Sequence, residues 1–350
     1  MWEKIPMRVS ALVLFFLVGC AMFMTLSRQE IDNKNLSSLV LTGYGQGTYQ
    51  YSAVETYLEE LRQLNLNTAS FLFTCYTKSK YSSEVDCNSY DSPGLEELSD
   101  AIVLAKRQGF LVNLRVYVDL KDFTWRCHWN PKNKKLVLDN LDQTLTKMAK
   151  FAERRKVEVL ILGAEYCQLT KTKYKKEWQN IIRSVRKEFH GKITYGANGA
   201  NDNNVEWNRI PFWNELDYIG IDHYQPLPEN IQGKDIETFQ TSKFKEYEKL
   251  SHKLNRPILI TEIGFPGQDK GHLRPFDWQL KGSSNQTRQA SNYRYTLKAI
   301  KKIKSIQGVF IWRKLTANKE QMQKTQSKAL DYELYHRKAW YEIQNFFQHY

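Results

Sequence analysis

The chain has 350 residues, of which 41% are hydrophobic and 13% aromatic, with 17 glycines and 9 prolines. This composition supports a large apolar core and excludes a disordered or fibrous chain, and the length allows one domain of roughly 300 residues or two smaller ones. The formal net charge is +13, from 51 Lys and Arg against 38 Asp and Glu. No recognition motif accompanies this charge, so the sequence argues against nucleic acid as a partner.

The basic residues are spread along the chain, in stretches such as NPKNKK, KTKYKK and KAIKKIK. Two of these stretches have helical spacing, and a solvated helix face is the simplest interpretation. The alternative is attraction to anionic lipid heads, cell-wall polymers or acidic glycans.

The amino terminus has the pattern of an export signal. Lys4 and Arg8 precede an uncharged stretch that includes ALVLFFLVGC, which is typical of the apolar part of a secretory signal. The stretch LVGC resembles a bacterial lipobox, in which Cys20 would become the lipidated first residue of the mature chain. The alternatives are an uncleaved signal anchor, since about 19 uncharged residues can just span a bilayer, and plain cleavage by a signal peptidase. All three export the domain across a membrane.

The expected organisation is a signal or anchor in residues 1–20, a polar tether in 21–37 and a folded domain in 38–350. We therefore expect an exported protein that is held at the membrane by its amino terminus and faces outside, or one that is secreted. A monomer is expected.

The cysteines agree with export. Setting Cys20 aside leaves Cys75, Cys87, Cys127 and Cys167, an even number for an oxidising compartment. The preferred pairs are Cys75 with Cys87 and Cys127 with Cys167, and free buried thiols are the alternative. With no CxxC spacing and no accompanying His cluster, we expect no metal site.

Short apolar runs alternate with segments of helical periodicity along the rest of the chain. The eight runs are SSLVLTG, NTASFLFT, FLVNLRVYV, VEVLILG, KITYGAN, DYIGID, RPILITE and GVFIWR. The helical patterns cover residues 53–64, 94–107, 141–155, 173–189, 242–254, 285–304 and 338–347.

Eight strands, each followed by a helix or loop, predict an α/β fold of the (β/α)8 TIM-barrel type. Continuous apolar strands suit a parallel sheet that is covered on both faces. The fifth connection, NDNNVEWNRIPFWNEL, is expected to be loop-like. A doubly wound open sheet is the alternative, but no glycine-rich phosphate fingerprint follows the first strand.

In a TIM barrel the chemistry lies at the carboxyl ends of the strands, and here those ends are rich in carboxylates and aromatic rings. They carry Tyr44, Thr74, Cys75, Tyr76, Tyr117, Asp119, Glu165, Asn198, Asp222, Tyr224, Glu262, Trp312 and Arg313. This set suits sugars, because rings stack on C–H bonds while amides and carboxylates bind hydroxyls.

Glu165 and Glu262 end the fourth and seventh predicted strands, which lie across the barrel mouth from each other. Two carboxylates about 5 to 5.5 Å apart are what a retaining glycosidase requires, one as nucleophile and one as acid/base. Burial near a second carboxylate would raise the pKa of the acid and keep it protonated near neutral pH. The alternative is that each glutamate caps a helix or pairs with a nearby Arg.

Three blocks carry a family resemblance: the segment that runs from VEVLILGAEYCQL to KITYGAN, FWNELDYIGIDHYQPL, and RPILITEIGFPG. They resemble the fourth-to-seventh strand blocks of glycoside hydrolase family 113, the retaining β-mannanases of clan A. LVNLRVYVDLKDFTWR is similar to the family's third strand, and the likeness extends over about residues 38–315. The resemblance implies that Glu165 is the acid/base and Glu262 the nucleophile.

Position and chemistry suggest roles for the other strand-end residues. Tyr224 would hydrogen-bond the nucleophile, Asn198 a sugar hydroxyl, and Trp312 would floor the subsite where the glycosidic bond breaks. Ordinary barrel packing is the alternative for each. The complete candidate substrate-binding set is Asn198, Asp222, Tyr224, Trp312, Tyr117 and Tyr44.

Some positions depart from the family pattern. Ala164 precedes Glu165 where many clan A enzymes have Asn, Gly199 stands where an aromatic residue is expected, and Val116 and Tyr117 replace Pro and His. Residues beyond 315 also lack the aromatic-rich form of the family's last loop. These departures concern the sugar that is bound rather than the fold.

The leading hypothesis is a membrane-tethered, extracellular, retaining β-glycoside hydrolase for mannan or manno-oligosaccharides. One alternative is a catalytically silent glycan-binding protein of the cell surface, and another is a glycosidase for a different, anionic β-glycan. None needs a cofactor, because carboxylates and water supply the chemistry.

Overall fold

The computed structural model describes residues 35–42, 44–199, 205–277, 282–315 and 330–350. The predictions for the signal segment, for Cys20 and for almost all of the tether lie outside the described residues. In the described ranges, no helix combines the length and apolar character needed to cross a membrane. Leu36–Tyr350 forms one compact unit.

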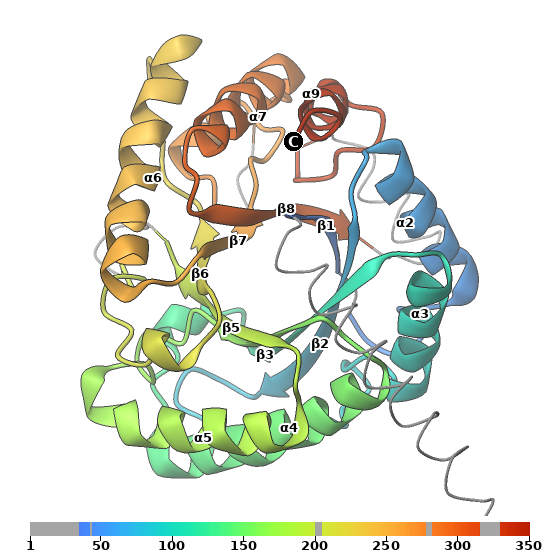
Figure 1. The fold of residues 1–350 in the computed structure, drawn as a ribbon, viewed down its shortest axis with the longest axis vertical. Helices are drawn as coiled ribbons and strands as arrows, with labels where there is room; N and C mark the ends of the chain where they lie inside the picture. The colour runs from blue at the N-terminus through green and yellow to red at the C-terminus, as the bar shows by residue number, and fades with distance from the viewer. Residues whose placement is uncertain (1–34, 43, 200–204, 278–281, 316–329) are drawn as a thin grey trace, which may run out of the picture. The chain divides into compact units, whose positions relative to one another are not determined.

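The strands form a closed parallel barrel in which each strand pairs with the next in chain order and β8 pairs with β1 (Figure 1). They are β1 (Leu36–Thr42), β2 (Thr68–Thr77), β3 (Leu111–Leu120), β4 (Val159–Ala164), β5 (Lys192–Asn198), β6 (Ile219–His223), β7 (Ile258–Ile263) and β8 (Ile306–Leu315). The predicted TIM barrel is therefore confirmed, and the open doubly wound sheet is excluded.

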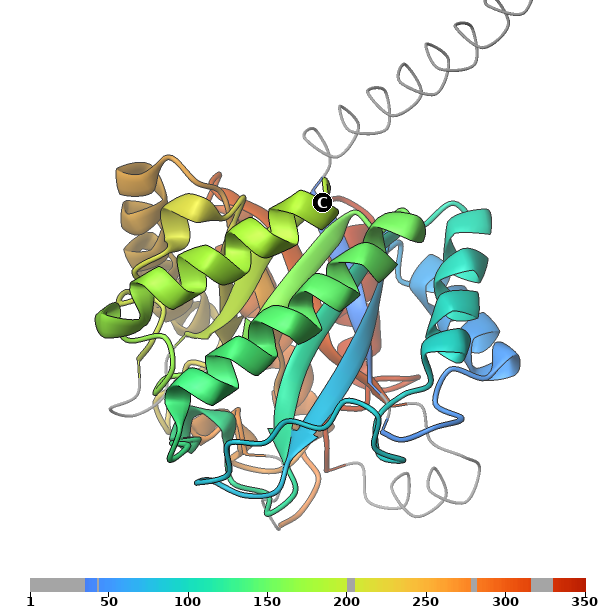
Figure 2. The ribbon, with the colours of Figure 1, turned by 90° about the horizontal axis from the view of Figure 1, so that it is seen from below.

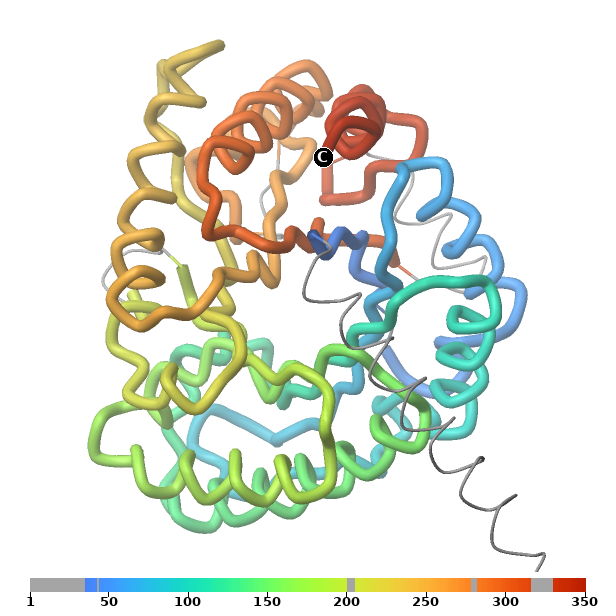
Figure 3. The backbone as a smooth tube through the Cα atoms, in the orientation of Figure 1, coloured from blue at the N-terminus to red at the C-terminus, as the bar shows by residue number. Residues whose placement is uncertain are grey.

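The barrel begins two residues before the predicted domain start at residue 38. Leu36 is fully buried and lies beside Gly308 of β8, and the backbone N–H of Ser37 donates to Asn67 Oδ1 at 3.0 Å. These contacts make Leu36 and Ser37 part of the closing strand. Figure 3 shows this closure, with the start of β1 (blue) beside β8 (red).

The helices form a ring outside the strands, and the side view shows them packed against the outer face of the tilted strands (Figure 2). They are α2 (Tyr51–Gln63), α3 (Leu95–Arg107), α4 (Lys134–Arg154), α5 (Lys175–Glu188), α6 (Lys234–Leu254), α7 (Gln286–Lys301) and α9 (Lys338–Phe347). Short 3-10 turns are η1 (Arg126–His128), η2 (Thr172–Tyr174), η3 (Trp213–Glu215) and η4 (Gly271–Leu273). In the described part of the fifth connection η3 is the only helical turn, in agreement with the predicted loop.

Two helices begin earlier than their apolar periodicity predicts. The start of α4 was expected at residue 141, but the Asn133 side chain caps the helix by accepting the Leu136 N–H at 3.0 Å. The start of α6 was expected at residue 242, but the helix begins after Gly233, whose φ of 51° favours glycine, and it already buries Ile236. The first turn of α6 is mostly polar, which hid it from a search for apolar repeats, whereas α4 already buries Val137 and Leu138 near its start.

The core fills the space between the strands and the helix ring. Every residue of β4 and β7 is buried, as expected for parallel strands covered on both faces. Trp178 of α5 stacks on Phe212 at 4.7 Å between ring centroids and meets Tyr195 of β5 edge-on at 5.5 Å. This aromatic cluster fixes α5 against β5, the strand that carries Asn198.

Two disulfides tie the loops at the carboxyl ends of the strands. Cys75 pairs with Cys87 and Cys127 pairs with Cys167. The preferred pairing is thus confirmed, and the alternative of free thiols is excluded for these four residues.

Candidate active site

The predicted site residues of four neighbouring strands lie at one level of the barrel. Asn198 of β5 is the register partner of Asp222 of β6, and Asp222 is the partner of Glu262 of β7. Glu165 directly follows β4, and its N–H donates to the Gly196 carbonyl at 2.9 Å. The structure therefore brings Glu165, Asn198, Asp222 and Glu262 together at the carboxyl end.

Glu262 is buried, and both of its oxygens have donors. Arg115 Nη1 donates to Oε1, and the Tyr224 hydroxyl donates to Oε2 at 2.8 Å. Burial raises the pKa of Glu262, the Arg115 charge opposes the rise, and Asp222 and Glu165 add to it. Two donors on one carboxylate favour its ionised form.

Arg115 is a central residue of the site that the strand-end search missed. It is almost completely buried inside the barrel, and its Nη2 lies 2.5 Å from Asp222 Oδ2 while Nη1 contacts Glu262. Thr261 Oγ1 completes the network by donating to Asp222 Oδ1 at 2.6 Å. Burial lowers the pKa of Arg115, but the two carboxylates outweigh burial, so the pKa is raised and the guanidinium stays charged. The feature of the sequence that could have revealed Arg115 is the presence of an arginine inside the apolar run FLVNLRVYV.

A glycine on the adjacent strand makes room for this guanidinium. A Cβ atom built on Gly196 of β5 would overlap Arg115 Nη2 and would lie 3.0 Å from Asp222 Oδ2. The position is thus restricted to glycine by the close approach of a buried ion pair.

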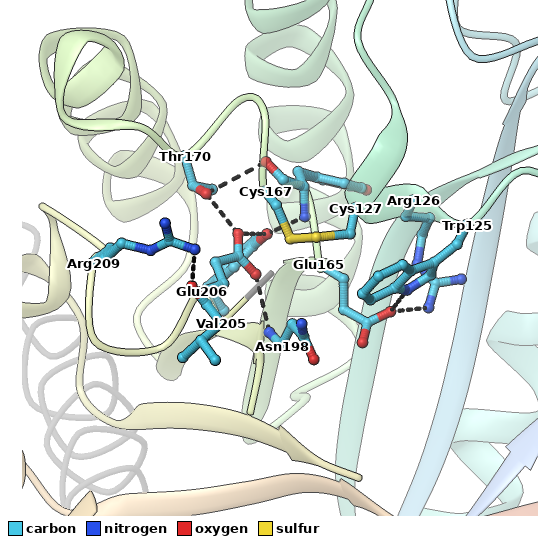
Figure 4. The surroundings of a disulfide bond; sticks show 12 residues. Trp125, Arg126, Cys127, Glu165, Cys167, Thr170, Asn198, Val205, Glu206 and Arg209 are labelled. Carbon is cyan, nitrogen blue, oxygen red and sulfur yellow. Dashed lines mark hydrogen bonds and ion pairs between the residues drawn. A yellow bond between two sulfur atoms is a disulfide. The ribbon is translucent and has the colours of Figure 1, made fainter. Parts of the chain in front are cut away.

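Glu165 is held by a different pair of donors. Its Oε2 accepts Trp125 Nε1 at 2.7 Å and Arg126 Nη2 at 3.1 Å (Figure 4). Burial raises the pKa of Glu165, Arg126 opposes the rise, and Asp222 adds to it. The backbone has a φ of 55°, in the left-handed region that is unfavourable for a side chain with a Cβ. Both of these donors address Oε2 rather than Oε1.

Trp125 and Arg126 belong to the loop between β3 and α4, and sequence reasoning did not single them out. Arg126 also lies 3.5 Å from Asp119 Oδ1 and covers the ring of Tyr117, with 4.7 Å between the guanidinium carbon and the ring centroid. The signal that could have found them is Cys127, because its predicted partner Cys167 lies two residues after Glu165.

The remaining predicted residues lie at the barrel mouth in different settings. Trp312, at the end of β8, is partly exposed, and its carbonyl accepts the Tyr293 hydroxyl at 3.3 Å. Tyr44 is 48% exposed in the loop after β1. Tyr117 is buried with Arg126 over its ring, which favours a supporting role over the predicted contact with sugar.

A further buried carboxylate, Glu206, lies behind the site. It accepts hydrogen bonds from Thr170 Oγ1 at 2.5 Å and from the Asn198 N–H at 3.0 Å (Figure 4). It also accepts a hydrogen bond from the Tyr195 hydroxyl at 3.0 Å. Burial raises the pKa of Glu206 to about 7. Glu206 thus fixes the backbone of Asn198, and its place in the fifth connection, which was expected to be loop-like, gave no signal of burial.

The described residues contain no group of three or more His, Cys, Asp and Glu side chains that could hold a metal ion. What the site does contain is two buried carboxylates with different donors, at the carboxyl ends of β4 and β7. Paired carboxylates are the groups with which many glycoside hydrolases supply an acid/base and a nucleophile.

Barrel and carboxylates together define the class as TIM-barrel glycoside hydrolases. Residues 41–337 match Glycoside Hydrolase Family 113, and the chain belongs to this family. The resemblance drawn from the strand blocks is thereby confirmed, and the protein is a glycoside hydrolase.

Solved structures share the fold. A family 113 β-1,4-mannanase aligns with a TM-score of 0.78 and 21% identity over 91% of this chain and 100% of that chain. The family 113 β-mannanase AaManA from Alicyclobacillus acidocaldarius aligns with a TM-score of 0.79 and 18% identity over 91% and 98%. A β-glucuronidase from Ruminococcus gnavus aligns at 0.60 and 11% identity over 90% of this chain and half of its own. The curated proteins contain no match.

Proposed function

We propose that this protein is a retaining β-glycoside hydrolase for mannan or manno-oligosaccharides, with Glu262 as nucleophile and Glu165 as acid/base. The observation that carries the assignment is the contrast between the two carboxylates. Glu262 has a donor on each oxygen, from Arg115 and Tyr224, whereas the donors to Glu165 converge on one oxygen. Membership of family 113, whose solved members include β-1,4-mannanases, supports mannan as the substrate class.

In the first step Glu262 attacks the anomeric carbon while the bond from that carbon to the glycosidic oxygen breaks. Arg115 favours the ionised form of the attacking carboxylate by opposing the pKa rise that burial causes, and Tyr224 orients it. Glu165 gives its proton to the departing oxygen, and its burial favours the protonated form that this step needs. The product is a glycosyl ester of Glu262 and a free leaving group.

In the second step a water molecule attacks the same carbon, and Glu165, now ionised, removes the proton of that water. The ester bond breaks and Glu262 leaves as a carboxylate, so the sugar is released with retained configuration. Arg126 and Trp125 stabilise the anionic form of Glu165 that exists between the two steps.

Sugar binding is assigned to the residues around this pair. Asn198, whose backbone Glu206 holds, offers an amide at the carboxyl end of β5, and Trp312 offers a partly exposed ring at the end of β8. Asp222 orients Arg115 through their ion pair. Tyr44 supplies an exposed aromatic ring beyond β1.

A direct test compares the wild type with Glu165→Gln and Glu262→Gln on β-linked manno-, gluco- and galacto-oligosaccharides and on acidic glycans. Cleavage of manno-oligosaccharides that both substitutions abolish is the expected result. Turnover that survives Glu262→Gln would remove the basis for the nucleophile. Tight binding without product in the wild type would favour a glycan-binding protein.

An anionic β-glycan is the second candidate substrate, and the net charge of +13 is the observation that favours it. Ionic strength separates the two candidates. The KM for a neutral mannan should change little with salt, whereas the KM for an anionic glycan should rise as salt screens the attraction.

Export with anchoring through the amino terminus is the localisation that we propose. The uncharged stretch after Arg8 and the two disulfides support it, since disulfides persist in oxidising compartments. Cys20→Ser should release the protein from the membrane fraction if Cys20 is lipidated. Unchanged membrane association would instead favour an uncleaved anchor.

A further inference from the structure

We propose that the Cys127–Cys167 disulfide positions the acid/base residue, so that proton donation to the leaving group depends on the oxidised state of this one disulfide. The inference rests on the proposed role of Glu165. It goes beyond that role because it makes the activity sensitive to reduction at a defined bond.

The disulfide joins the two segments that must meet at Glu165. Cys127 directly follows Trp125 and Arg126 in the loop after β3, and Cys167 lies two residues after Glu165 in the loop after β4. Figure 4 shows the disulfide beside the contact, with Trp125 and Arg126 reaching Glu165 from the neighbouring loop. The covalent link is therefore within two residues of both donors and of their acceptor.

The acceptor side needs such a restraint, because Glu165 has a φ of 55° and its backbone would relax if it were released. Two hydrogen bonds hold this segment on the β5 side: the Glu165 N–H donates to the Gly196 carbonyl at 2.9 Å, and the Tyr166 N–H donates to the Tyr195 hydroxyl at 2.6 Å. On the β3 side the Tyr166 hydroxyl accepts the Val118 N–H at 2.6 Å. The disulfide adds a covalent link to the loop after β3, which carries both donors.

The donor side is anchored both before and after Trp125 and Arg126. Before them, the Lys121 N–H donates to the Thr77 carbonyl at 3.0 Å, and Asp122 Oδ2 accepts the Lys80 N–H at 3.0 Å. Trp129 is fully buried, and its Nε1 donates to the Ser82 carbonyl at 3.0 Å. Trp125 precedes this anchor in irregular backbone, and Arg126 begins the 3-10 turn η1. Opening the disulfide would loosen this short segment between the two anchors, and with it Trp125 and Arg126, relative to Glu165.

The second disulfide is a matched control. Cys75 and Cys87 join β2 to its following loop, where the N–H and carbonyl groups of Tyr76 and Asp86 already pair at 2.7 and 2.8 Å. Neither cysteine belongs to the segments that meet at Glu165. Removal of this disulfide should therefore leave proton donation unchanged.

The test measures kcat/KM for two substrates in the full-length protein. A manno-oligosaccharide has a poor leaving group and needs the acid, whereas a 2,4-dinitrophenyl β-mannoside has a leaving group that departs without a proton. For Cys127→Ser/Cys167→Ser we expect a loss of about 10- to 100-fold on the oligosaccharide, because a small misplacement of a catalytic group costs up to about 100-fold. On the dinitrophenyl substrate we expect a loss of less than about threefold. Cys75→Ser/Cys87→Ser should keep both values.

Chemical reduction of the disulfide tests the same inference without a substitution at Cys127 or Cys167. A dithiol reductant is oxidised to its own disulfide as it converts Cys127–Cys167 to two thiols, and this should reproduce the selective loss in the wild type and in Cys75→Ser/Cys87→Ser. Cys127→Ser/Cys167→Ser should not respond further. If the double variant fails to fold, the dithiol titration of Cys75→Ser/Cys87→Ser, followed by circular dichroism, carries the test.

Full activity on the oligosaccharide after loss of the disulfide, or an equal loss on both substrates in a folded protein, would overturn the inference. Glu165→Gln separates this failure from that of the proposed function. If Glu165→Gln is selective for the oligosaccharide and the cysteine variant is not, only the positioning role is wrong. If Glu165→Gln affects both substrates equally, the acid/base assignment itself fails.

Discussion

Arg115→Lys is the substitution that tests the nucleophile most sharply. The Arg115 guanidinium contacts Glu262 with one nitrogen and Asp222 with the other, and a lysine offers a single nitrogen for both. When the ammonium group pairs with Asp222, Glu262 loses one hydrogen bond from a charged donor. Such a bond contributes about 1.5 to 3 kcal/mol. At 1.36 kcal/mol per unit, the pKa of Glu262 should therefore rise by about 1 to 2 units.

The pH profile of kcat/KM measures this shift. Glu262 must be ionised to attack, so a raised pKa moves the acidic limb of the profile to higher pH by the same amount and leaves the activity above the limb less affected. The dinitrophenyl substrate isolates the limb, because its leaving group does not need Glu165. Burial already raises the pKa of Glu262 to about 8, so profiles between about pH 5 and 11 cover the expected range.

Tyr224→Phe provides a comparison for the size of the pKa shift in Arg115→Lys. It removes a neutral donor to Glu262 at 2.8 Å, and such a bond contributes about 0.5 to 1.5 kcal/mol. The acidic limb should then shift by about 0.4 to 1 unit, less than for Arg115→Lys. An unshifted limb in a folded Arg115→Lys protein would refute the reasoning, because the ionisation of Glu262 would then not depend on its buried cation.

Three further changes have defined outcomes. Gly196→Ala should lower the free energy of unfolding by about 1 to 3 kcal/mol through overpacking against Arg115 and should reduce turnover; wild-type stability in denaturant titrations would contradict this. Burial raises the pKa of Glu206 to about 7, so the stability that its protonated form contributes is complete below about pH 4.5 and is lost as the pH rises through 7. The difference in Tm between wild type and Glu206→Gln should accordingly fall from pH 5 to pH 8, and a constant difference would show that Glu206 does not titrate there. Loss of the Cys127–Cys167 disulfide, whose cysteines are 40 residues apart, should lower the free energy of unfolding by about 4 kcal/mol if the disulfide acts through chain entropy. Loss of Cys75–Cys87, with a separation of 12, should lower it by about 3 kcal/mol. The reverse order in denaturant titrations would contradict loop entropy as the cause.

The barrel was predictable because parallel strands covered on both faces leave continuous apolar runs, and eight such runs are present. Glu165 and Glu262 were predictable for the same reason, since each ends one of those runs and the fold places strand ends at the mouth. The starts of α4 and α6 were not, because a cap at Asn133 and a positive φ at Gly233 set them rather than apolar periodicity.

The buried charged residues could not be predicted from the local sequence pattern. Arg115 is stable inside the barrel only because Asp222 and Glu262 neutralise it, and these partners lie 107 and 147 residues further along the chain. Glu206 is similar, since its three donors come from β5 and the loop after β4. Trp125 and Arg126 were within reach, because the predicted disulfide already brought their loop to Glu165.

The backbone conformation of Glu165 lowers the stability of the fold at a position that the proposed catalysis requires. A left-handed φ of 55° costs a residue with a Cβ roughly 1 to 2 kcal/mol, and a buried carboxyl near Asp222 adds to the cost. Glycine at this position would relieve both penalties. Directed evolution that screens only for heat resistance would therefore tend to discard the acid/base residue, and a library built on this barrel needs a turnover screen at every round.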